Sequence, residues 1–305
     1  MALAREVWLN IVEDNLFTPQ LSQVQQAIKD DSAFVYQGGG VTTVHIPNAG
    51  TKATVTKGND TYPVAVTKRT DSDNSYTLYN YEVGPLVVQI KDGQLNSYEQ
   101  TESILRDQTG GLGERVASEI MIGHYHYSTG LYRATTGADA PAHAPGGTGN
   151  RKSFIGADLR AALGILDKNK VGMNDRYLIV DSVMYWQLLT DLGYTAYRDD
   201  SRNLGPDGKL LNLYGVTIIP MPTVVYATTA GVVRTYGDSG TTTDMSVALL
   251  VQKNCTSMAM TDIYTQMNEA ATGYFGGTYE ATVMAGGKYR RTDKYGVVPI
   301  IQIGT

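Results

Sequence analysis

The segment from Lys57 to Leu86 constrains the fold most, because it alternates as β-strands do but has too little apolar surface for a core of its own. Val64 and Val66 alternate with smaller or polar residues, and a similar alternation recurs around Tyr79. The pattern predicts a long β-hairpin whose turn is the wholly polar stretch 71–75. A hairpin alone is only marginally stable in water. The rest of this chain or another molecule must therefore supply the surface that stabilises it.

Composition favours another molecule as that surface. Charged residues make up 18% of the 305 residues, whereas about one quarter is usual. Tyrosine is abundant, with 21 Tyr against 4 Phe and 2 Trp, and its large ring with a polar tip suits interfaces that form from water. The alternative, a tyrosine-rich β protein without partners, stays open. The length is typical of two domains or one large one.

Charge and cysteine content exclude some classes of protein. The net charge of −5 argues against a general nucleic-acid binder, which needs a basic face, but not against a protein that encloses DNA without gripping it. The single cysteine, Cys255, cannot form an internal disulfide, which is typical of a reducing compartment. Neither a secretion signal nor an apolar stretch of membrane-spanning length is found. The sequence predicts a soluble chain made in the cytoplasm.

Helical signals occur in the first half of the chain. Residues 1–36 carry two short apolar stripes, the second formed by Val24, Ala27 and Ile28, and predict an arm with local helix. A longer helix begins at a capping box of Ser97 and Gln100. Three glycines interrupt that helix, and each costs about 1 kcal/mol relative to alanine. We therefore expect a bend or a break at Gly110, Gly111 and Gly113.

The second half alternates strands and helices and then becomes purely β. Residues 133–151 lack periodicity and predict a loop or a boundary. Residues 152–222 predict a compact α/β piece: an amphipathic helix, the strand 176–180, a second helix that ends at Gly193, and the strand 214–222. Several strands follow to the C-terminus. The predicted fold class is α+β.

Chemical motifs are weak throughout. The stretch 146–153 has Lys152 and Ser153, but Arg151 stands where a phosphate-binding loop needs glycine, so a polar loop is expected. His124 and His126 lack cysteine or carboxylate neighbours and are expected to be structural. We find no catalytic constellation, no cofactor motif and no metal motif. A chain with a sound core, an arm and an unpartnered hairpin is typical of a building block of an assembly, which strands can join through their edges.

The order of parts resembles a tailed-phage major capsid protein of the Hong Kong 97 type. The stretch "YTLYNYEVGPLVVQIKDGQLNSYEQTESILRDQTGGLGERVASEIM" is similar to that family's passage from an extended hairpin, the E-loop, into a long spine helix. "DRYLIVDSVMYWQLLTD" with "LLNLYGVTIIPMP" resembles the strand–helix–strand of the axial domain. The resemblance implies an N-terminal arm at 1–50 and an E-loop at 51–90. It also implies a peripheral domain at 91–130 with 256–290, and an axial domain at 131–255 with 291–305.

The resemblance also implies the function. The chain would be a structural protein, not an enzyme, that self-assembles as pentamers and hexamers of an icosahedral virion shell around double-stranded DNA. Its partners would be further copies, a portal and a separate scaffolding protein, because no scaffold-like segment precedes the arm. It would be made in the host bacterial cytoplasm and bind DNA without sequence specificity. The candidate inter-subunit contacts are Lys57, Tyr62, Val64, Val66, Lys68, Arg69, Leu78, Tyr79 and Trp8.

Three other interpretations stay open. An encapsulin, a bacterial shell that holds cargo protein, would have the same fold. A phage tail or neck protein would share the abundance of Tyr and Thr. An enzyme with an unrecognised site is the third. A covalent cross-link from Lys57 or Lys68 to a neighbour's asparagine, known in some members of the family, is not carried over because no partner asparagine is identifiable.

Overall fold

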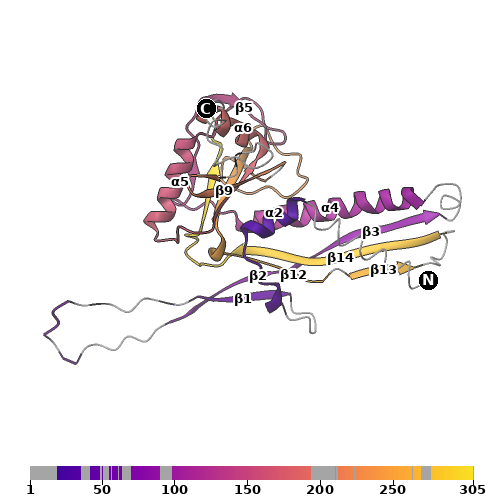
Figure 1. Ribbon diagram of the computed structural model, residues 1–305, viewed down its shortest axis with the longest axis horizontal. Helices are drawn as coiled ribbons and strands as arrows, with labels where there is room; N and C mark the ends of the chain where they lie inside the picture. The colour runs from indigo at the N-terminus through magenta and orange to yellow at the C-terminus, as the bar shows by residue number, and fades with distance from the viewer. Residues whose placement is uncertain are drawn as a thin grey trace.

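An elongated layer and a compact α/β unit share a common core in the computed structural model (Figure 1). The structure describes residues 19–35, 42–48, 50, 55, 57–60, 62–63, 70–89, 98–193, 210, 212–222, 224–262, 264–268 and 276–304. The sequence-based prediction of an α+β fold is confirmed by this mixture of helices and sheets.

The elongated layer is a sheet covered by one long helix. Its centre is β14 (Gly276–Tyr289), which pairs antiparallel with β3 (Tyr79–Gln89) along one edge. Along its other edge it pairs with β12 (Thr256–Met260) and β13 (Tyr264–Asn268). Helix α4 (Tyr98–His124) lies on this sheet (Figure 1).

The predicted break at Gly110, Gly111 and Gly113 is wrong, because α4 is one continuous helix. The glycines cost about 1 kcal/mol each, but burial of one large aliphatic side chain gives back about 1.5–3 kcal/mol. The buried face of α4 consists of Leu112, Val116, Ala117, Ile120 and Met121. The helix is therefore held by packing, not by the helix propensity of its residues. The capping box at Ser97 lies outside the described residues.

Part of the predicted arm belongs to the core. Helix α2 (Pro19–Ala27) packs against α4 and buries the predicted stripe of Val24, Ala27 and Ile28. The chain then continues through a short 3₁₀ turn, η1 (Ser32–Phe34), beside β12, where the Asp31 amide donates to the Met258 carbonyl at 2.8 Å. Burial of this stripe fixes residues 19–35 to the body.

The compact unit is built around a second, seven-stranded sheet. Its strands run in the order β4–β15–β11–β7–β9–β8, and β10 pairs with β11. The parallel pair β7 and β9 is joined through α6, as the 152–222 pattern predicts. The strands are β4 (Arg133–Ala134), β15 (Val297–Ile301), β11 (Met245–Gln252), β7 (Arg176–Asp181), β9 (Val216–Met221), β8 (Asn212–Leu213) and β10 (Val225–Ala227), and the helices are α5 (Gly156–Lys168) and α6 (Ser182–Leu192).

The two faces of this sheet have different partners. Leu178 and Val180 pack in a cluster with residues of α5 and α6. Ile179, between them, packs in the cluster that includes α2 and α4. Alternate residues of a strand point to opposite faces, so α5 and α6 cover one face and the elongated layer meets the other.

The predicted loop at 133–151 contains short strands. Besides β4, it includes β5 (Asp139–Pro141) and β6 (Asn150–Lys152), which pair antiparallel. Arg151 is buried in β6 and its guanidinium donates to the carbonyls of Thr148, Asn150, Thr242 and Asp244. An arginine that satisfies backbone carbonyls is what lets this glycine-rich, aperiodic sequence order.

A projecting connection leaves the body from a third sheet. Strand β1 (Thr43–Asn48) pairs antiparallel with β2 (Ser72–Thr77), and the chain between them passes through residues 57–60, which lie far from the body (Figure 1). The predicted turn at 71–75 is therefore wrong. Its polar residues form β2 because Asn74 faces inward and donates to the Tyr289 carbonyl at 2.7 Å.

Candidate assembly surfaces

The far end of the β1–β2 connection presents side chains to solvent. Lys57 is exposed, and Tyr62 is 79% exposed. Both are predicted contact residues, and both belong to the connection between β1 and β2. Val64, Val66, Lys68, Arg69 and Trp8 lie outside the described residues.

The base of this connection is anchored to the body. Leu78 is only 3% exposed and packs with Val44, Ile46, Tyr76 and Ala259. The prediction that Leu78 becomes buried against a neighbour is wrong, because its own chain already buries it. Tyr79, the next residue, is 65% exposed and points to the other side of the strand.

Hydrogen bonds reinforce that base. The Tyr76 hydroxyl lies 3.0 Å from the Ser257 hydroxyl, and burial raises the pKa of Tyr76 to about 12. Lys288 Nζ donates to the Ser75 carbonyl at 3.0 Å, and Asn48 donates to the Arg290 carbonyl at 2.8 Å. The connection can therefore project without loosening the body.

The face of the long sheet opposite α4 is polar and acidic. Tyr81 and Val83 of β3 pack toward the core with α4, so Glu82 points outward. Glu82, Thr282 and Tyr264 stand in one row across the three strands. Together with Gln266 and Glu280 they line a pocket of about 380 Å³.

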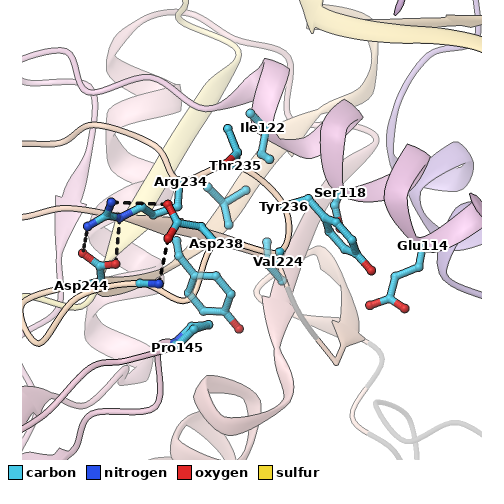
Figure 2. Close-up of a pocket in the computed structure, with 14 residues that line it drawn as sticks. Glu114, Ser118, Ile122, Pro145, Val224, Arg234, Thr235, Tyr236, Asp238 and Asp244 are labelled. Atoms are coloured by element: carbon cyan, nitrogen blue, oxygen red, sulfur yellow. Dashed lines mark hydrogen bonds and ion pairs between the residues drawn. The ribbon is translucent and has the colours of Figure 1, made fainter. Parts of the chain in front are cut away.

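A second pocket, of about 290 Å³, lies where the elongated layer meets the compact unit; we call it the junction pocket (Figure 2). Its walls are mainly apolar, from Ile122 of α4, Pro145, Val224 and Val225. Glu114 of α4 and Asp238 of the loop after β10 supply carboxylates. The remaining lining residues are Ser118, Tyr226, Arg234, Thr235, Tyr236, Gly237, Gly240 and Asp244.

The loop that forms one wall of this pocket is held by ion pairs. Arg234 Nε lies 2.8 Å from Asp244 Oδ2, and Arg234 Nη1 lies 3.4 Å from Asp238 Oδ2. Burial opposes ionisation of Asp244, but hydrogen bonds from Arg234 and Thr241 outweigh it and lower the pKa of that carboxyl.

Helix α4 holds the same loop from the other side. The Arg115 guanidinium lies 5.0 Å from the centre of the Tyr236 ring and donates to the Tyr236 carbonyl at 3.0 Å. Burial and the neighbouring Glu114 raise the pKa of the Tyr236 hydroxyl. The pocket is therefore preformed from both halves of the molecule.

An exposed aromatic surface on α6 was missed in the sequence. Trp186 is 60% exposed and Val183, one turn before it, is 41% exposed. A helical wheel could have found this surface, because Met184, Tyr185, Leu188 and Leu189 fill the buried face of α6 and leave Trp186 opposite.

The described residues offer little chemistry. His124 and His126 are structural, as predicted: His124 is fully buried with Nδ1 2.7 Å from the Ile120 carbonyl, and His126 Nε2 lies 2.9 Å from the Val297 carbonyl. Burial lowers the pKa of His124 to about 4. Burial raises the pKa of the half-buried Cys255 thiol. Within the described part of the chain, no three His, Cys, Asp or Glu residues gather as a metal site.

Membrane insertion by a helix has no support in the described part of the chain. None of the helices there is both long enough and apolar enough to cross a bilayer.

Comparison of the whole chain with solved structures finds phage capsids. The capsid of Helicobacter pylori bacteriophage KHP30 matches with a TM-score of 0.61 at 10% identity, over 90% of this chain and 87% of that chain. The chain has a phage capsid fold. The capsid of cyanophage Pam1 matches with a TM-score of 0.60 at 10% identity, over 91% of this chain and 88% of that one.

A third capsid agrees, and sequence comparisons add nothing. The capsid of cyanophage P-SCSP1u matches with a TM-score of 0.57 at 15% identity, over 86% of this chain and 84% of that chain. No protein-family model and no curated protein matches the sequence. The likeness to capsid proteins is therefore a likeness of fold.

Proposed function

We propose that this chain is the major capsid protein of a tailed phage, a structural protein that forms an icosahedral shell around double-stranded DNA. The observation that carries the proposal is the fold shared with several phage capsids over 86% to 91% of the chain. The exposure of Lys57 and Tyr62 on the connection between β1 and β2 is consistent with a role in assembly.

The parts of the capsid fold can be assigned within this proposal. Helix α4 is the spine helix, and with the β12–β14–β13–β3 sheet it forms the peripheral domain. The compact unit is the axial domain. The E-loop is the connection 49–71, shorter than the 51–90 expected from the sequence, because β2 and β3 are part of the body.

Contacts between copies follow from the surfaces described above. The E-loop of one copy would lie on a neighbour, where Tyr62 and Tyr79 lose their exposure to water. Lys57 would face carboxylates, and the proposal assigns this role to Glu82 and Glu280, which are both exposed on the outer face of the long sheet. Weak contacts of this kind suffice, because a closed shell multiplies them.

The charge of the chain fits a container. A net charge of −5 favours holding DNA without adhesion, since tight binding to phosphates needs many Lys and Arg contacts. Pentamers and hexamers of one sequence, a separate scaffolding protein and a portal complete the proposed assembly.

Electron microscopy of the purified protein, with its mass measured by light scattering, tests the proposal. We expect closed shells of uniform diameter. Tubes or single rings would instead support a tail or neck protein. A stable monomer would move the test to co-expression with the scaffolding protein, and a monomer there too would contradict self-assembly. Nucleic acid inside shells recovered from infected cells would separate a capsid from an encapsulin, which would contain a cargo protein.

A further inference from the structure

Trp186 is presented as a rigid anchor on the surface of the compact unit. Its ring makes an edge-to-face contact with Tyr185, with ring centres 5.8 Å apart at 71°. Tyr185 is itself buried and accepts a hydrogen bond from the Leu210 amide at 2.9 Å. An exposed tryptophan held in one orientation loses little conformational freedom on binding, and tryptophans that enter pockets dominate interface energies.

The junction pocket has the size and chemistry for one such side chain. Its volume of about 290 Å³ is at the lower limit of small-molecule sites, which span about 300–1,000 Å³. Ile122, Val224 and Val225 provide apolar walls. An indole has one N–H donor and no acceptor, and the Glu114 and Asp238 carboxylates are acceptors.

The two surfaces lie on opposite sides of one sheet. Helix α6 packs on the face of β7 to which Leu178 and Val180 point. Val225 of the pocket packs in the cluster of Ile179, which points to the other face. A single chain cannot place its own Trp186 in its own pocket across the sheet. A contact between different surfaces of identical chains is head-to-tail, and such contacts close into rings when the rotation allows.

We propose that Trp186 of one copy enters the junction pocket of the next copy, and that this contact joins copies around a ring. The proposal rests on the proposed function in one respect, namely that the chain assembles with itself. Val183, which is 41% exposed, flanks Trp186 on α6, and Ser118 forms part of the pocket wall.

Truncation of the anchor tests the proposal first. Trp186→Ala should raise the protein concentration needed for assembly by about 30-fold or more, as removal of an interface hot spot does. Because Trp186 is exposed in the single chain, the melting temperature of the unassembled variant should hardly change. Met173→Ala is the matched control, since it removes a 72% exposed apolar side chain elsewhere on the compact unit and should leave assembly unchanged.

Blocking the pocket should have the same effect from the opposite partner. Thr235 lines the pocket and is exposed, so Thr235→Trp fills the mouth without disturbing the core. Mixing this variant with Trp186→Ala should restore no rings. The intact anchor of one variant can enter the intact pocket of the other, but the next junction around the ring then has neither an anchor nor an open pocket.

Disulfide cross-linking between copies tests whether position 186 of one copy meets position 235 of the next. Cys255 is the only cysteine, so Cys255→Ser gives a background for Trp186→Cys combined with Thr235→Cys. Oxidation of the assembled protein should give a ladder of disulfide-linked chains that ends at the ring size, and neither single cysteine should cross-link.

Three outcomes would overturn the proposal. Shells from Trp186→Ala at the wild-type protein concentration would show that the anchor is dispensable. Dimers from Trp186→Cys alone would show a symmetric contact, and an assembled double-cysteine variant without interchain disulfides would place the two surfaces apart. If the wild-type chain forms no assembly either alone or with its scaffolding protein, the proposed function fails, which is a distinct result from these three.

Discussion

In the compact α/β unit, large side chains such as Phe154 and Leu188 are fully buried by their own chain, whereas Tyr62, on the connection between β1 and β2, is 79% exposed. The anchored base lies between these extremes, because Leu78 is buried and its neighbour Tyr79 is not. The difference indicates that the compact unit and the connection have separate roles. The compact unit carries the stability of the subunit, and the connection carries surface that a single subunit leaves unused. Changes in the two regions should therefore affect different measurements.

The largest effect on assembly should come from removal of the connection. Residues 51–69 can be replaced by Asn-Gly, because Gly50 and Thr70 lie side by side just beyond Asn48 and Ser72, the last pair of β1–β2, and a two-residue turn closes such a hairpin. We expect a folded subunit with an unchanged unfolding midpoint that forms no shells in microscopy. Wild-type shells from this variant would contradict the separate roles of the two regions, because assembly would then not need the connection.

The largest effect on stability should come from the compact unit. Leu188→Ala leaves a cavity in the cluster with Leu178 and Val180, and such truncations cost about 2–5 kcal/mol. Urea unfolding of the unassembled subunit measures this loss. Val183→Ala is the control on the same helix, and because Val183 is partly exposed it should change the unfolding free energy far less. Equal losses for the two variants would contradict the assigned burial of α6.

The same division explains what sequence patterns could and could not predict. Periodicity predicted the helices α5 and α6 and the strands β7 and β9, because each buries a regular apolar face within the chain. It failed at Asp71–Ser75, where Asn74 finds a backbone carbonyl in β14, a partner more than 200 residues away. It also failed at Gly110 and Gly111, where packing of α4 outweighs local helix propensity. Trp186 was missed because its exposure follows from which residues of α6 are buried, and residue 186 alone does not show this.

Acid should weaken the body of the subunit through buried histidines. Burial lowers the pKa of His124 to about 4, below its ordinary value of 6.5, so the unfolded chain binds the proton more readily. The contribution of neutral His124 to the free energy of unfolding is therefore complete above pH 6.5, and it is lost as the pH falls from 6.5 toward 4. The loss from this group at pH 4 is about 3 kcal/mol at 1.36 kcal/mol per pKa unit. The pKa of His126 is lowered in the same direction, also by burial.

Urea unfolding of the unassembled subunit at pH 7 and pH 4.5 measures this dependence. In His124→Gln the slope between these values should be shallower than in the wild type, because one of the groups that takes up a proton on unfolding is gone. An unchanged slope would assign the acid sensitivity to other groups and would leave His124 with a packing role alone.

The smallest effect should come from reversal of a single charge on the connection. Lys57→Glu would place a carboxylate opposite Glu82 and Glu280 of a neighbour, and an exposed ion pair is worth about 0.2–1 kcal/mol per contact. We expect a several-fold rise in the concentration needed for assembly, with no change in unfolding. Lys168→Glu on α5 is the matched control, since Lys168 is exposed on the compact unit and should tolerate the change.

Assembly measured at low and at high salt tests whether Lys57 acts through its charge or through packing. At 1 M salt the Debye length falls to about 3 Å, so wild type and Lys57→Glu should assemble alike there. Restoration of assembly by Glu82→Lys in the Lys57→Glu variant at low salt would place the loop of one copy on the outer sheet of the next. If the defect persists at high salt, or if Glu82→Lys deepens it, Lys57 acts through another partner. In that case the acidic face of the long sheet is not the surface that receives the connection.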